Sequence, residues 1–123
     1  MLKIEKPIAS GFDTVVMNER FKCAFITHSP YYSFGKVDHM KRHNNTDEVF
    51  VLLSGRAVML ILEDGKVQEH TLEQGIAYNV QKGTWHYLAV SEDAQIFVAE
   101  GADTDETNTD VLSLEQLYFV EEI

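Results

Sequence analysis

The chain has 123 residues, of which 45% are hydrophobic and 24% are charged, a balance typical of a folded globular protein and not of a disordered one. Its length predicts a single domain spanning residues 1–123. With 10 basic against 20 acidic residues, the net charge of −10 excludes the basic surface that nucleic-acid binding requires. The one cysteine, Cys23, excludes a secreted scaffold held together by internal disulfides.

No segment of the sequence predicts a membrane span or a secretion signal. The longest apolar run, Ala57 to Leu62, has six residues, whereas a span needs about 20. The first residues, Met1 to Pro7, lack the apolar core of a signal peptide. We therefore expect a cytoplasmic protein with neither a membrane nor a nucleic acid as its partner.

Short apolar segments rich in Val, Ile, Phe and Tyr follow one another along the chain and predict β-strands. Turn-forming residues separate them, among them Ser54–Gly55, which predicts a tight hairpin, Asp64–Gly65, and Gln81 to Gly83. This spacing favours a β-sandwich or small barrel of antiparallel strands. The expected strands are Arg20–His28, Tyr31–Lys36, Val37–His43, Glu48–Leu53, Arg56–Leu62, Val67–Leu72, Ile76–Val80, His86–Ser91 and Gln95–Gly101.

Two of these strands, 48–53 and 56–62, are apolar on both faces. In the first of them Phe50 and Leu52 point to one side, and Val49, Val51 and Leu53 point to the other. Neither face can be left in water, so one face is expected to fill the barrel and the other to pack on a second sheet or a second subunit. This pattern favours a homodimer.

The C-terminal region predicts a short helix. The sequence Ser113-Leu114-Glu115-Gln116 matches a capping box, with Ser113 as N-cap and Gln116 returning to its backbone. Leu114 and Leu117 would lie on one helical face. The polar, acidic segment 102–110 is interpreted as the linker that lets this helix dock on the barrel.

Three histidines and one carboxylate are the candidate catalytic or metal-binding residues of the sequence. Because side chains alternate along a strand, His39, Lys41 and His43 share one face, and Glu48 opens the next strand. His86 follows the turn that ends at Gly83. If the shared face is the barrel interior, His43, Glu48 and His86 converge there. Two histidines and one carboxylate with open positions make a recognised site for a divalent first-row metal.

At these residues the chain resembles the cupin superfamily, whose first motif pairs two histidines with a glutamate and a glycine. The second motif of the family combines glycines, a proline and a histidine. The resemblance covers residues 37–101 and implies an all-β fold, the double-stranded β-helix or jelly-roll barrel, with a metal ion inside it. The matching residues are His43, Glu48, Gly55, Gly75, Gly83 and His86.

The chain departs from the family's pattern at three positions. Lys41 stands where the family places its first metal-binding histidine, Gln81 stands where it places proline, and Val90 stands where an asparagine sometimes follows the last histidine. Three of the customary ligands remain, His43, Glu48 and His86, which suit iron, manganese, nickel, cobalt, copper or zinc. His39, on the same strand face as Lys41, is a substitute ligand. A buried Lys41–Glu48 ion pair with no metal is the competing interpretation.

Three functions are consistent with this pattern, two of them catalytic. In the first, the metal acts as a Lewis acid on a small polar or anionic metabolite, while Lys41 neutralises its charge and His39 carries a proton. In the second, Lys41, Glu48 and His86 perform metal-free acid–base chemistry, because Gly83-Thr84-Trp85-His86 is similar to the Gly-x-Trp-His stretch of ureidoglycolate lyase-like cupins. In the third, the barrel is a non-catalytic module that binds a small ligand or a second copy.

Overall fold

The structure is a computed structural model that describes residues 1–122. In these residues no helix is long and apolar enough to cross a membrane. The elements in chain order are β1 (Gly11–Met17), β2 (Phe21–Thr27), β3 (Gly35–His43), β4 (Glu48–Ser54), β5 (Ala57–Glu63), β6 (Lys66–Thr71), β7 (Ala77–Val80), β8 (Trp85–Val90), β9 (Gln95–Gly101), the single-turn 3-10 helix η1 (Glu106–Asn108) and β10 (Thr109–Val120).

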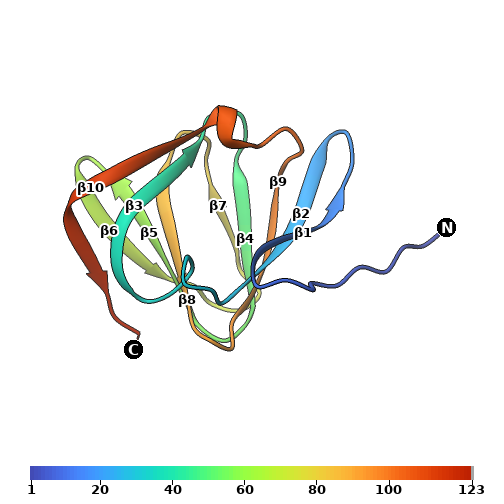
Figure 1. The fold of residues 1–123 in the computed structure, drawn as a ribbon, viewed down its shortest axis with the longest axis horizontal. Coiled ribbons are helices and arrows are strands. Elements are labelled where there is room, and N and C mark those ends of the chain that lie inside the picture. Colours follow the sequence, from blue (N-terminus) through green and yellow to red (C-terminus); the bar gives the residue numbers. More distant parts are fainter. Residues whose placement is uncertain (123) are drawn as a thin grey trace.

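The strands form two five-stranded sheets that curl around a shared interior (Figure 1). One sheet has the order β1-β2-β9-β4-β7 and the other β10-β3-β8-β5-β6, with antiparallel pairing between neighbouring strands. From β2 to β5, and again from β6 to β10, the chain changes sheet at every step. This alternation is the double-stranded β-helix, so the predicted all-β jelly-roll barrel is confirmed.

Eight of the nine predicted strands correspond to strands β2 to β9, with shifts of a few residues at their ends. The strand predicted over 31–36 is wrong, since only Gly35 and Lys36 belong to β3. The backbone of this segment is bound by a side chain instead of a neighbouring strand. The hydroxyl of Tyr87 donates hydrogen bonds to the carbonyl oxygens of Tyr31 and Ser33, at 2.7 and 3.1 Å. An additional edge strand, β1, lies outside the predicted set.

Of the predicted turns, only Asp64–Gly65 closes a hairpin, between β5 and β6. Both residues have positive φ, 50° and 73°, as a type I′ turn requires. The hairpin predicted at Ser54–Gly55 is wrong, because β4 and β5 lie in different sheets. Gly55 carries the chain between the sheets with a φ of +74°, and its Cα lies so near Ala94 that an added Cβ would meet the Ala94 Cα at 2.5 Å.

The predicted C-terminal helix is also wrong, because Ser113 and Gln116 lie within the long strand β10. β10 pairs with β3 in two stretches, with Thr109 opposite His43 and Tyr118 opposite Val37. Pairing with β3 satisfies backbone groups that an isolated turn of helix would leave to water, and this tertiary gain outweighs the local capping pattern. The one helical turn, η1, falls within the expected linker instead. There the capping box is formed by Asp105 and Asn108.

The apolar side chains form two clusters, one on each face of the second sheet. Ala57 and Met59 of β5 contribute to the cluster inside the barrel, whereas Val58 and Leu60 contribute to the cluster outside it. Residues of the same chain, including Val120, cover that outer face of β5. The homodimer expected from two-faced strands therefore stays a prediction: the outer face of β5 is shielded within one protomer, whereas Leu53 on the outer face of β4 is 45% exposed.

Candidate functional site

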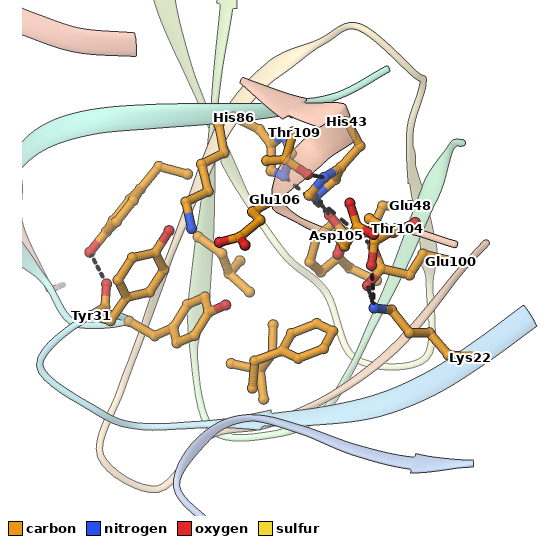
Figure 2. Close-up of a pocket in the computed structure, with 17 residues that line it drawn as sticks. Lys22, Tyr31, His43, Glu48, His86, Glu100, Thr104, Asp105, Glu106 and Thr109 are labelled. Carbon is orange, nitrogen blue, oxygen red and sulfur yellow. Dashed lines mark hydrogen bonds and ion pairs between the residues drawn. The ribbon is translucent and has the colours of Figure 1, made fainter. Parts of the chain in front are cut away.

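One end of the barrel collects the polar side chains that the two motifs predict. His43 ends β3, Glu48 begins β4 and His86 is the second residue of β8. Because neighbouring strands are antiparallel, these ends meet at the same end of the barrel. They line a cavity of about 330 Å³, which η1 borders through Glu106 (Figure 2). This volume suits a small metabolite, since ligand pockets typically run from about 300 to 1,000 Å³.

The carboxylate of Glu48 joins the two imidazoles. Its Oε1 lies 3.2 Å from Nε2 of His43 and 3.1 Å from Nε2 of His86. One donor atom from each of the three residues lies within 4.8 Å of the other two. Glu48 is 4% exposed and His86 8% exposed, so the group is nearly dry. His43, Glu48 and His86 thus lie together in the structure, as the sequence predicts.

The far nitrogen of each imidazole is anchored by a second layer of polar groups. Nδ1 of His86 lies 2.9 Å from the carbonyl oxygen of Thr84, and because a carbonyl only accepts, this nitrogen carries the hydrogen. Nδ1 of His43 lies 2.8 Å from the hydroxyl of Thr109. In a neutral His86 the Nε2 lone pair then faces the Glu48 oxygen, an arrangement that a proton or a cation between them stabilises. Anchoring of the far nitrogen is typical of metal-ligating histidines.

Glu48 and the neighbouring imidazole of His43 change each other's pKa values. Burial works against ionisation of Glu48, yet hydrogen bonds and positive charge from His43 and His86 lower the pKa of its carboxyl. Burial likewise opposes the charged form of His43, but the hydrogen bond to Glu48 raises the pKa of this imidazole above its usual 6.5. The site therefore favours a negative Glu48 carboxylate beside a protonated or metal-bound His43 imidazole.

A second carboxylate, Glu100, lies in the group, and sequence analysis missed it. It sits on β9 directly opposite Glu48 and directly opposite Lys22 in register. Nζ of Lys22 is 3.6 Å from its Oε1 and donates a hydrogen bond to the carbonyl oxygen of Thr104 at 2.7 Å (Figure 2). Burial and the nearby charge of Glu48 raise the pKa of Glu100 to about 7.

A signal for Glu100 was present in the sequence. Along β9 the inward positions are Ile96, Val98 and Glu100, so a glutamate ends an otherwise apolar face. A carboxylate on such a face is costly to bury and marks a site. This position lies outside both cupin motifs, which is why motif matching did not reach it.

Lys41 and His39 lie further from the three-residue group. Lys41 is opposite His86 in register, and its Nζ lies 5.0 Å from the centre of the Tyr31 ring. Within residues 1–122 the ion-pair partners of Glu48 are the two imidazoles, so the competing Lys41–Glu48 pair is not formed. The His39 ring lies 5.2 Å from the Tyr31 ring and 6.0 Å from the Tyr87 ring, with Nδ1 2.7 Å from Asp38.

The residues of the group fit a divalent metal ion. Imidazole and carboxylate ligands about 2.1 Å from an ion lie roughly 3.0–3.4 Å apart when adjacent in octahedral or tetrahedral geometry, close to the 3.1 and 3.2 Å separations measured at Glu48. The second carboxylate leaves Oε2 of Glu100 buried with no hydrogen-bond partner in the described residues. A cation would satisfy that oxygen, and the ammonium of Lys41 is directed to Tyr31 and not to the group.

Comparison with known proteins agrees with the fold. No protein-family model matches the chain. Two curated proteins of Lupinus angustifolius, conglutin beta 1 and conglutin beta 7, are each 36% identical to it over 56 residues, 46% of this chain. The matched segment spans 9% of the length of these relatives.

Solved structures resemble the chain over most of its length. A Pac13 variant from Streptomyces crystallised with uridine superposes with a TM-score of 0.66 at 10% identity, covering 98% of this chain and 95% of that one. A cupin-2 domain protein from Shewanella frigidimarina gives 0.57 at 22% identity, covering 74% and 79%. QdtA 3,4-ketoisomerase from Thermoanaerobacterium thermosaccharolyticum gives 0.60 at 16% identity, covering 72% and 63%. The chain has the fold of the cupin superfamily.

The role of the groups that anchor the far nitrogen of each imidazole can be tested at the hydroxyl of Thr109. Replacing Thr109 by Val removes the group that binds Nδ1 of His43 while keeping the shape of the side chain. We expect divalent-metal affinity to fall about 10-fold, since outer-layer partners typically contribute 10–100-fold. Isothermal titration with Zn²⁺ measures this change. Thr109→Ser, which keeps the hydroxyl, should bind like the natural protein, and equal affinities in both variants would contradict the expected role.

Proposed function

We propose that this protein binds one divalent transition-metal ion through His43, Glu48 and His86 and acts on a small polar or anionic metabolite in the adjoining cavity. The observation that carries the proposal is the pair of imidazoles whose Nδ1 atoms are anchored and whose Nε2 atoms meet one buried carboxylate oxygen. When bound, the metal would supply Lewis-acid chemistry toward a carbonyl or carboxylate.

The residues around the cavity support the binding of such a metabolite. Lys41 lines the cavity and supplies a positive charge for an anionic group. His39 contacts the cavity through Tyr31 and Tyr87, which line it and which its ring touches. Its expected role as a proton carrier therefore requires transfer through these phenols or through water. Two proteins of similar fold were crystallised with small molecules, a Pac13 variant with uridine and a QdtA double mutant with TDP, which supports the binding of a small polar molecule here.

Elemental analysis of the untagged protein tests the metal proposal. We expect close to one equivalent of iron, manganese, nickel, cobalt, copper or zinc per chain, either as purified or after reconstitution under anaerobic conditions. The identity of the metal then narrows the reaction to redox or Lewis-acid chemistry. A protein that stays metal-free after reconstitution with iron, manganese, nickel and zinc would overturn the proposal.

A second candidate function is metal-free acid–base chemistry carried by Lys41, Glu48 and His86. It is favoured by Lys41 standing in the cavity opposite His86, where the family motif has a histidine. The likeness to Pac13, described as a nucleoside dehydratase, is consistent with lyase chemistry of this kind. Binding of uridine or a ureido acid to metal-free protein, with no gain on adding metal, would favour this candidate over the first.

Both candidates give Lys41 the task of binding an anionic group. Lys41→Met removes the charge and keeps most of the apolar stem. We expect the affinity for anionic ligands, taken from a calorimetric screen of small carboxylates and TDP, to fall roughly 10- to 100-fold, since a hydrogen bond to a charged group contributes about 1.5–3 kcal/mol. Lys36→Met, an exposed change on the same strand, is the control. Equal losses in both variants would contradict a specific role for Lys41.

A further inference from the structure

Three charged side chains form a row across the sheet that contains β2, β9 and β4. Lys22 on β2, Glu100 on β9 and Glu48 on β4 are direct partners in the register of neighbouring strands. All three side chains line the cavity, and both glutamates are buried. Like charges directly opposite each other on neighbouring strands repel, and burial strengthens that repulsion. Among the described residues, Lys22 and the imidazoles of His43 and His86 are the ion-pair partners of these two carboxylates.

Lys22 satisfies only one side of Glu100. Its ammonium lies near Oε1 and is held in place by the carbonyl oxygen of Thr104. The other oxygen, Oε2, is buried, has no hydrogen-bond partner among the described residues and lies 3.9 Å from Nε2 of His43. Buried polar atoms are almost always satisfied, so an orphaned carboxylate oxygen beside the ligand group needs an explanation.

We propose that Glu100 is a fourth protein ligand of the metal, filling the coordination position that Lys41 leaves without a donor. The inference rests on the proposed metal site. Two atoms that each bind one ion at about 2.1 Å can lie at most about 4.2 Å apart, and the 3.9 Å between Oε2 of Glu100 and Nε2 of His43 is within that limit. The donor atoms of His43, Glu48 and His86 lie within 4.8 Å of one another without Glu100, so ligation requires the Glu100 side chain to move toward them when the ion binds. Lys22 then acts as the outer partner that orients the carboxylate by binding its other oxygen.

This ligand set differs from the one that the family resemblance implies. It holds two imidazoles and two carboxylates, so the two negative charges balance a divalent cation. Oxygen ligands suit manganese, whereas nitrogen-rich sets suit copper, nickel and zinc. The exchange of a histidine for Lys41 on β3 and the gain of Glu100 on β9 therefore shift the preference of the site toward Mn²⁺ or Fe²⁺.

Substitution of Glu100 by Gln tests this ligand directly. Glutamine keeps an oxygen for Lys22 but loses the second anionic oxygen, so a merely structural contact survives while metal ligation does not. Titration with Mn²⁺, followed by the EPR signal of the free ion, should give an affinity at least about 10-fold below that of the natural protein. Glu106→Gln, which changes an exposed carboxylate lining the same cavity, should stay within about twofold.

The outcomes separate this inference from the proposed function. If the natural protein binds no Mn²⁺, Fe²⁺ or Zn²⁺, the metal site itself fails and Glu100 has nothing to bind. If it binds Mn²⁺ and Glu100→Gln binds it equally well, the site stands and the fourth ligand is refuted. Glu100→Asp, which keeps the charge but withdraws the oxygens, is the second variant should Glu100→Gln not fold. Weakened Mn²⁺ binding by folded Glu100→Asp supports the inference, and unchanged binding overturns it.

Discussion

Replacing His86 by Ala is expected to abolish stoichiometric metal binding. The change removes Nε2, one of three donors within 4.8 Å of each other, and breaks the anchored arrangement in which Thr84 fixes the ring. Loss of an outer-layer partner alone typically costs 10–100-fold in affinity, so loss of the ligand itself should cost more than about 100-fold. Elemental analysis and Mn²⁺ titration of protein prepared alongside the natural form measure the effect.

The matched controls for His86→Ala are other histidines. His43→Ala should lose the metal to the same extent, because its Nε2 approaches the same Glu48 oxygen. His70→Ala changes an exposed histidine on β6 outside the group and should retain full metal content. Metal retained in His86→Ala and His43→Ala at the natural level would show that these imidazoles are not the ligands. Loss of metal in His70→Ala would indicate non-specific binding.

Replacing Gly55 by Ala is expected to destabilise the fold by about 2–5 kcal/mol. A residue with a side chain pays about 1–2 kcal/mol for the left-handed conformation that the φ of +74° requires. The new Cβ would also meet the backbone of Ala94, at 2.5 Å from Cα and 2.7 Å from N, and such overpacking typically costs a further 1–3 kcal/mol. Urea unfolding followed by circular dichroism measures the difference.

Gly65 offers the matched control for that substitution. Its φ of +73° is nearly identical, but an added Cβ there meets nothing within 4 Å. Gly65→Ala should therefore show the backbone cost alone, about 1–2 kcal/mol. If the two variants unfold at the same urea concentration, the close approach of Gly55 to Ala94 does not limit stability.

The fold was predictable from sequence because the barrel is built from short strands with strong local signals. Apolar residues such as Phe50 and Leu52 alternate along a strand, and turn residues such as Asp64 and Gly65 interrupt the chain at regular intervals. Errors arose where partners distant in sequence decide the structure. Ser54–Gly55 has the composition of a hairpin turn, but it joins two sheets, and only the packing of Gly55 on Ala94 distinguishes the two cases.

The C-terminal strand and part of the site were hidden for the same reason. The capping pattern at Ser113 is a local signal, whereas the pairing of β10 with β3 depends on residues about 70 positions earlier in the chain. Motif spacing predicted the convergence of His43, Glu48 and His86, because these residues fall within the motifs. Glu100 joins them through the register of β9 with β4, which no spacing in the sequence reveals.

The segment that crosses from β9 to β10 contains residues that hydrogen-bond to the polar group and other residues that only line the cavity. Thr104 holds Lys22 through its carbonyl oxygen and Thr109 holds His43 through its hydroxyl, so both ends of the crossing are tied to the polar group. Between them, Asp105 and Glu106 border the cavity with exposed side chains that contact none of the candidate ligands by hydrogen bond. Glu106 can therefore be substituted without loss of these hydrogen bonds, whereas Asp105 is the N-cap of η1 and accepts a hydrogen bond from the backbone N–H of Thr107. Glu106 is thus the position in this surface turn where a selection library could vary the proposed metabolite specificity while the contacts of the polar group stay in place.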